Sequence, residues 1–114
     1  KLPGLPFEHI KDVVLGKKYT LSLVIVGKTA MQKLNKDYRG KNKATDILSF
    51  SLSKSEGEIF INPDSARAKA RQFDRTYENY LAFLFIHGLC HLKGFDHGDE
   101  MEKTEAKTRK KFKI

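Results

Sequence analysis

Cysteine, tryptophan and long apolar segments are scarce or missing in this chain. One cysteine, Cys90, and no tryptophan occur among 114 residues. A single cysteine excludes an internal disulfide and fits a reducing compartment, so we expect a cytoplasmic protein. The longest apolar run, residues 81–86, is much shorter than a membrane span, and the first residues show no signal-peptide pattern. We therefore expect no membrane partner.

Acidic residues are fewer than basic ones: the chain has 22 Lys and Arg but 14 Asp and Glu, which gives a formal net charge of +8. Such an excess favours a polyanionic partner, either a nucleic acid or an anionic membrane surface. A simpler alternative is that the charge serves solubility, since part of it lies in residues 107–113, which fit a solvated helix end. The length fits one domain, residues 1–114.

Histidine is concentrated in one stretch, since three of the four histidines fall between positions 87 and 97. His87 and His91 are four residues apart and would share one face of a helix, close enough for both rings to bind one ion. Gly94 fits a helix stop, after which the chain could bring His97 back as a third ligand. Three histidines without an obvious fourth protein ligand predict a catalytic zinc site with an open position. The alternative is a hydrogen-bonded histidine pair without a metal.

The residues between these histidines limit the chemistry. Zinc peptidases of the H-E-x-x-H type carry a glutamate after the first histidine as general base, whereas this chain has Gly88. Cys90 is off the face shared by His87 and His91, so we expect it to pack in the core. Asp96 precedes His97, and either orientation of a ligand, a general-base role or a plain turn position would explain it.

Hydrophobic periodicity and turn signals predict five helices and three strands. The helix of residues 77–93 is apolar nearly all round in its middle, which predicts a central buried helix carrying His87 and His91. We expect Thr29, Asn62 and Thr76 to cap helices, and the last two strands to form an antiparallel hairpin. The fold class predicted is α+β, a small mixed sheet covered by helices. The expected helices are 6–15, 29–38, 62–73, 77–93 and 100–112, and the expected strands are 19–26, 47–52 and 58–61.

Two segments resemble one family, the YbeY endoribonucleases. Residues 87–97 read H-G-L-C-H-L-K-G-F-D-H, close to the family pattern H-G-x-x-H-L-x-G-x-D-H. Residues 34–50 match L-N-x-x-Y-R followed by T-D-V-L-S-F, and residues 57–59 resemble the G-D-I or G-E-I strand of the family. Motif order and spacing agree from about Ser22 to His97. The chain departs from the pattern at Ala44, where proline is usual. The family normally has a further strand before the first helix, and because the sequence begins at Lys1-Leu2-Pro3 we expect that strand to be missing or replaced.

The resemblance implies a zinc-dependent endoribonuclease specific for single-stranded RNA, acting in ribosomal RNA maturation at the 3′ end of 16S rRNA and in ribosome quality control. It places one zinc ion on His87, His91 and His97, and gives Arg39 of the Y-R motif a role at the substrate. It also suggests the small ribosomal subunit or its proteins as partners. By position alone, Arg39 could equally be a solvated loop charge.

The residues suggest a mechanism. Zinc can lower the pKa of bound water to about 7 and polarise a phosphoryl oxygen, while Arg39 could hold the charge that develops on phosphate. Two other functions compete with this one. A zinc metallopeptidase would explain only the metal. A non-catalytic RNA-binding module with structural zinc would require a fourth protein ligand. Imidazole ligands also suit nickel and copper.

Overall fold

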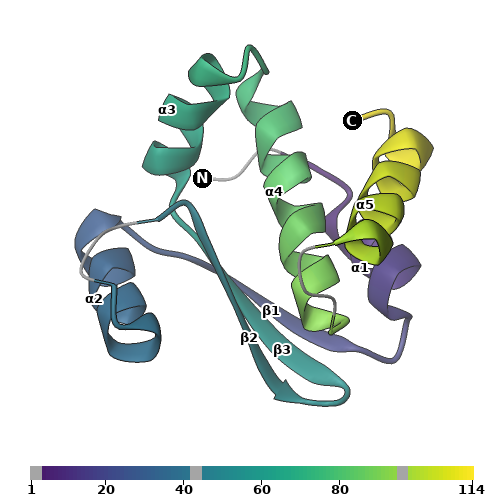
Figure 1. Ribbon diagram of the computed structural model, residues 1–114, viewed down its shortest axis with the longest axis horizontal. Helices are drawn as coiled ribbons and strands as arrows, with labels where there is room; N and C mark the ends of the chain where they lie inside the picture. Colours follow the sequence, from purple (N-terminus) through teal and green to yellow (C-terminus); the bar gives the residue numbers. More distant parts are fainter. Residues whose placement is uncertain (1–3, 42–44, 95–97) are drawn as a thin grey trace.

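A computed structural model describes residues 4–41, 45–94 and 98–114. The elements follow one another as predicted: a helix, a strand, a helix, two strands and three helices (Figure 1). The helices are α1 (Phe7–Leu15), α2 (Lys28–Arg39), α3 (Pro63–Gln72), α4 (Tyr77–Leu92) and α5 (Asp99–Phe112), and the strands are β1 (Thr20–Ile25), β2 (Ile47–Ser53) and β3 (Glu56–Ile61). The predicted α+β class is therefore confirmed, and none of the described helices is long and apolar enough to cross a membrane.

The sheet is small and mixed, with strand order β1-β3-β2. β1 runs parallel to β3, whereas β2 and β3 form the expected antiparallel hairpin. In this register Ser49 lies opposite Ile59 and Leu48 opposite Phe60, so each pair shares one face of the sheet. Ile59 is fully buried beneath α4, while Phe60 contacts Phe50, whose ring also meets Tyr38 of α2.

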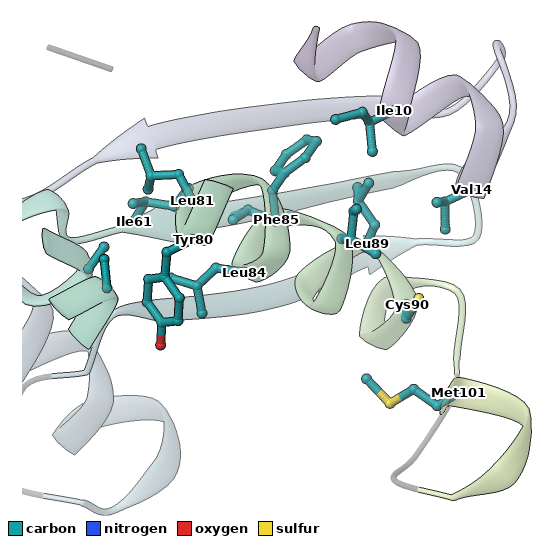
Figure 2. Close-up of a cluster of buried hydrophobic side chains, with 14 residues drawn as sticks. Ile10, Val14, Ile61, Tyr80, Leu81, Leu84, Phe85, Leu89, Cys90 and Met101 are labelled. Atoms are coloured by element: carbon teal, nitrogen blue, oxygen red, sulfur yellow. The ribbon is translucent and has the colours of Figure 1, made fainter. Parts of the chain in front are cut away.

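The helix α4 is the centre of the molecule. It packs against α1, α3, α5 and β2, which explains why its sequence is apolar nearly all round (Figure 1). Leu81, Phe85, Ile86 and Leu89 are fully buried, and Figure 2 shows Phe85 and Leu89 between Ile10 of α1 and the sheet. The predicted central buried helix is thus confirmed, and His87 and His91 lie on it.

Gly88 lets α4 lie directly on the sheet. A Cβ atom at this position would stand 2.8 Å from Ser49 Oγ, 3.0 Å from Ile47 Cδ1 and 3.2 Å from Ile59 Cδ1. Ser49 Oγ also donates a hydrogen bond to the Gly88 carbonyl oxygen at 3.3 Å. A side chain at the position of the peptidase glutamate would therefore require Ser49, its neighbours or the helix itself to shift.

Helix ends follow the expected signals in two cases of three. Asn62 Oδ1 accepts from Ser65 N, and Thr76 Oγ1 accepts from Asn79 N at 3.1 Å, so both predicted caps are confirmed. The predicted cap at Thr29 is wrong, because α2 begins at Lys28 after Gly27, whose backbone is extended.

Arg39, expected in a loop, is the last residue of α2, and Gly40 ends that helix with φ of 68°. Gly94, the predicted stop after α4, has φ of 100°, a value that glycine adopts at little cost.

Candidate metal and nucleic-acid site

The two histidines of α4 point toward one another. His87 Nε2 and His91 Nε2 are 3.1 Å apart, and the two rings are nearly perpendicular with centroids 4.6 Å apart. A separation of 3.1 Å fits a hydrogen bond between the two rings, the alternative considered from the sequence, and it is also near the spacing of about 3.3 Å expected for two nitrogens that each bind one tetrahedral zinc ion at about 2.0–2.1 Å. The helical spacing expected to bring both rings together does so.

Glu105 of α5 fixes the orientation of His87. Its Oε2 lies 2.8 Å from His87 Nδ1, and the carboxylate is largely buried, with 12% of the side chain exposed. Because a carboxylate only accepts hydrogen bonds, Nδ1 carries the proton in this contact, and in the neutral ring Nε2 is the nitrogen left to bind a metal. Carboxylate-oriented histidines of this kind are typical of zinc sites, where they also raise the basicity of the ligand.

The third predicted ligand, His97, lies outside the described residues, as does Asp96. Within residues 4–41, 45–94 and 98–114, no group of three or more His, Cys, Asp or Glu side chains forms a metal-binding cluster. Of the three predicted ligands, the described residues therefore include His87 and His91, and the structure adds Glu105, which was not predicted, behind His87. Its donor set, two imidazole nitrogens with a carboxylate behind one of them, suits zinc.

The histidine pair lies in an open cleft of about 800 Å³ between the β2 edge, α4 and α5. Arg39 lines the same cleft from the end of α2, so the structure brings this residue to the cavity that holds His87 and His91. Lys69 and Arg109 add two more cations to its wall. A cleft with this lining offers an anionic ligand several positive partners around the two imidazoles.

A buried aspartate supports the wall of the cleft. Asp46 is 5% exposed; its Oδ2 accepts a hydrogen bond from the Tyr80 hydroxyl at 3.0 Å and lies 3.3 Å from Lys69 Nζ. Burial, and secondarily the nearby Asp46 carboxylate, raise the pKa of Tyr80 well above its usual value, so its hydroxyl stays a hydrogen-bond donor. This arrangement ties the start of β2 to α3 and α4, which holds one side of the cleft in place.

The ring of Phe83 forms another part of the wall. It is half-buried because it lines the cleft, unlike its five apolar neighbours in residues 81–86, which are buried. The guanidinium groups of Arg75 and Arg109 lie 4.6 and 5.3 Å from its centroid. The burial predicted for the middle of this helix is therefore only partly met at Phe83, whose ring shares the surface with Arg75 and Arg109.

Cys90 is not among the residues that line the cleft and belongs to the buried core that includes Met101 (Figure 2). It is fully buried, and desolvation, with a smaller contribution from Glu105, raises the pKa of its thiol to about 11. This agrees with the packing role expected for this residue.

Sequence reasoning missed Glu105 and Asp46. Glu105 lies four positions after the buried apolar residue Met101 and therefore shares the inward face of α5. This helical spacing was the only feature of the sequence that could have indicated an inward-facing Glu105. Asp46 belongs to the T-D pair of the second motif, but only the fold shows that its partners are Tyr80 and Lys69. Both contacts join segments far apart in the chain, so no local pattern reveals them.

The fold and the cleft together describe an α+β protein with a carboxylate-supported histidine pair in a cation-lined cavity. The family model described as Endoribonuclease YbeY matches residues 7–113. The chain belongs to this family.

Individual relatives agree with the family match. The chain is 37% identical over 104 residues to Endoribonuclease YbeY of Staphylococcus carnosus, covering 81% of this chain and 68% of that protein. It is 39% identical over 99 residues to Endoribonuclease YbeY of Thermodesulfovibrio yellowstonii, covering 81% of this chain and 61% of the relative. The chain thus spans roughly two thirds of the length of these curated relatives.

A solved structure shares the fold. The solution structure of TM1509 from Thermotoga maritima matches with a TM-score of 0.65 and 26% sequence identity, covering 94% of this chain and 81% of that chain.

Proposed function

We propose that this protein is a metal-dependent endoribonuclease that cleaves single-stranded RNA in the maturation of ribosomal RNA. The observation that carries the proposal is the pair of facing Nε2 atoms of His87 and His91, with Glu105 behind His87, in the cleft that Arg39 also lines. Membership of the Endoribonuclease YbeY family supports an RNA substrate. Processing of the 16S rRNA 3′ end, ribosome quality control, contact with the small ribosomal subunit and a cytoplasmic location belong to the same proposal.

His87 and His91 would hold the metal, with His97 as the proposed third ligand. When bound, zinc would supply a Lewis acid that polarises a phosphoryl oxygen and acidifies water. The chain's own groups supply the rest. Glu105 keeps His87 in the binding tautomer, and Arg39 pairs its planar donors with the non-bridging phosphate oxygens, where negative charge develops during cleavage. For Asp96 we propose orientation of His97 or acceptance of a proton.

Two other hydrolytic or binding roles receive less support. A peptidase of the H-E-x-x-H type needs a base at position 88, and the packing of Gly88 against Ser49 and Ile47 leaves no room for one. A structural zinc site would be saturated by protein ligands, whereas His87 and His91 face an open cleft.

The decisive experiment is a cleavage assay with zinc-loaded and chelated protein on single-stranded RNA, the matching duplex and a peptide. We expect cleavage of the single strand only, dependent on metal and abolished in His87→Ala and His91→Ala. His9→Gln is the matched control, because the remaining described histidine packs on Phe112 of α5, away from the cleft. Full RNA cleavage by chelated protein, or by His91→Ala, would contradict the proposal, as would peptide cleavage in place of RNA cleavage.

A further inference from the structure

A second cavity, of about 520 Å³, lies between α1, the end of α4 and α5. These three helices pack on one another, and Figure 1 shows α1 and α5 together on the same side of α4. Among the described residues, no acidic side chain lines this cavity, whereas four lysines do: Lys93, Lys107, Lys110 and Lys111. We call this cavity the lysine pocket.

In the part of the chain that the structure describes, the lysines of this pocket form no ion pair with a carboxylate. Among the described residues, the ion pairs to carboxylates involve Lys11, Arg67, Lys69 and His87, and none involves a lysine of the pocket. Lys93 Nζ donates to the carbonyl oxygen of Val14 at 3.1 Å, which holds its charge at the pocket while leaving further N–H donors. The pocket therefore concentrates positive charge that the described part of the protein does not neutralise.

Local helix energetics explain only part of this cluster. Lys110 and Lys111 lie in the last turn of α5, where a cation interacts favourably with the helix dipole. Lys107 lies a turn earlier and is four residues before Lys111, so the two ammonium groups share a helix face and repel one another. Such a pair lowers the stability of an isolated helix, and an anion bound between the two charges would remove that cost.

The rest of the lining suits a chain of phosphates. The Thr104 and Thr108 hydroxyls each donate to a backbone carbonyl four residues earlier, so these hydroxyls are held in α5 and the lysines remain the donors available to a ligand. Val13 and Val14 form an apolar floor against which lysine methylenes can pack. Lysine ammonium groups on flexible stems favour phosphates without reading bases.

The helix α5 connects the lysine pocket to the histidine cleft. Glu105 and Arg109 line the cleft, whereas Thr104, Lys107, Thr108 and Lys111 line the pocket, so the two cavities lie on different sides of one helix. An α-helix with its side chains is about 10–12 Å across, a distance that a few nucleotides of single-stranded RNA can cover.

We propose that the lysine pocket is a second RNA-binding site, which holds the phosphate backbone of a single strand whose neighbouring segment occupies the histidine cleft. This inference rests on the proposed function, because it takes RNA as the substrate. The site acts by charge and without sequence preference, so it increases affinity for RNA long enough to pass over α5 and leaves shorter RNA unaffected.

The test measures RNA binding separately from cleavage. Chelated protein is titrated into fluorescein-labelled single-stranded RNA of about 3 nucleotides, too short to pass over α5, and of about 24 nucleotides, over a range of salt concentrations, and binding is followed by anisotropy. The variant is Lys107→Gln with Lys111→Gln. The matched control is Lys28→Gln with Lys33→Gln, which removes two exposed α2 charges outside both cavities. Circular dichroism confirms that both double variants are folded.

We expect the pocket variant to bind the long RNA more weakly and to lose about 0.7 in the slope of log K against log salt for each phosphate contact removed. Its affinity for the short RNA, and its zinc-dependent cleavage of that RNA, should match those of the parent protein. Equal losses in the pocket variant and the α2 control, or an unchanged slope, would overturn the inference while leaving the proposed function intact. Binding of both double variants to anionic lipid vesicles is measured in parallel. If the pocket substitutions weaken binding to the vesicles but not to RNA, the pocket contacts a membrane surface and the inference is wrong. Failure of the parent protein to bind or cleave either RNA would refute the proposed function itself.

Discussion

At the scale of single residues, the most informative contact is the one between Glu105 Oε2 and His87 Nδ1 at 2.8 Å. It joins α4 to α5 and selects which imidazole nitrogen faces His91. In the absence of that carboxylate the ring could rotate or change tautomer, and its Nδ1–H would lose a buried acceptor. The contact thus gives α5 a part in the site that its mostly charged sequence conceals.

We predict that Glu105→Ala weakens zinc binding by about 10–100-fold, the usual effect of removing such an orienting partner. Glu105→Gln should lose less, because the amide oxygen still accepts from Nδ1. Zinc affinity is measured by competition with a chromophoric chelator, and Glu102→Ala, an exposed position of the same helix, is the control. Parent-like zinc affinity in folded Glu105→Ala would show that the carboxylate has no part in metal binding.

Arg39 is the residue for which substrate chemistry gives the clearest expectation. Arg39→Ala should leave folding and metal content unchanged, because Arg39 is an exposed residue at the end of α2. Cleavage of single-stranded RNA should fall by at least about tenfold, since loss of one charge-stabilising donor costs about 10²–10³ in rate in other enzymes. Arg39→Lys should recover part of the loss, because it keeps the charge without the paired donors. Parent cleavage rates in Arg39→Ala would mean that Arg39 is simply solvated charge.

At the scale of secondary structure, the contact between α4 and β2 determines where the histidines lie. The backbone of α4 approaches the sheet at Gly88, directly between the two histidines in sequence. A glycine in mid-helix costs about 1 kcal/mol relative to alanine. Here that cost is offset by close packing on Ile47, Ser49 and Ile59. This packing sets the distance between the sheet and the part of α4 that carries the two histidines.

We predict that Gly88→Ala destabilises the protein by about 1–3 kcal/mol despite the better helix propensity of alanine, because its Cβ meets Ser49 Oγ at 2.8 Å. The free energy of unfolding is measured by urea denaturation. Adding Ser49→Ala removes the nearest atom and should recover part of the loss, a coupling that independent sites would not show. An unchanged or higher stability of Gly88→Ala would contradict the close approach.

At the scale of the whole molecule, the proposed metal would link parts of the chain that lie far apart in sequence. His87 and His91 belong to α4, Glu105 belongs to α5, and His97 precedes α5, so a bound ion would strengthen the association of both helices. A ligand that binds only the folded state stabilises it by mass action, by about 2.7 kcal/mol at a concentration of 100 times Kd.

We therefore predict that zinc at such a concentration raises Tm by roughly 10 °C relative to the chelated protein, as expected for a domain of this size. The shift is measured by differential scanning calorimetry. His9→Gln should keep the full shift, whereas His91→Ala should lose most of it. Equal shifts in His91→Ala and the parent protein would place the zinc elsewhere.

Local sequence determined most of the elements. Runs of alternating or continuous apolar residues, Asn62 and Thr76 as caps, and Gly94 as a stop depend on interactions within a few residues, so the order of helices and strands was predictable, as was the central position of α4. That His87 and His91 share one helix face was predictable for the same reason, whereas the orientation of the His87 ring depends on Glu105. Where a local signal was ambiguous, as at Thr29 and Gly27, the predicted boundary was wrong by one or two residues.

Tertiary structure alone decided which groups surround the histidines. Glu105, Asp46 and Arg39 reach the cleft from α5, from the start of β2 and from the end of α2, and their distances depend on how these elements pack on α4. The strand order β1-β3-β2 and the close approach at Gly88 likewise depend on contacts between residues distant in sequence. These contacts arise because folding buries apolar surface from all the helices and strands together. A short segment of the sequence does not show how the other segments will pack on it.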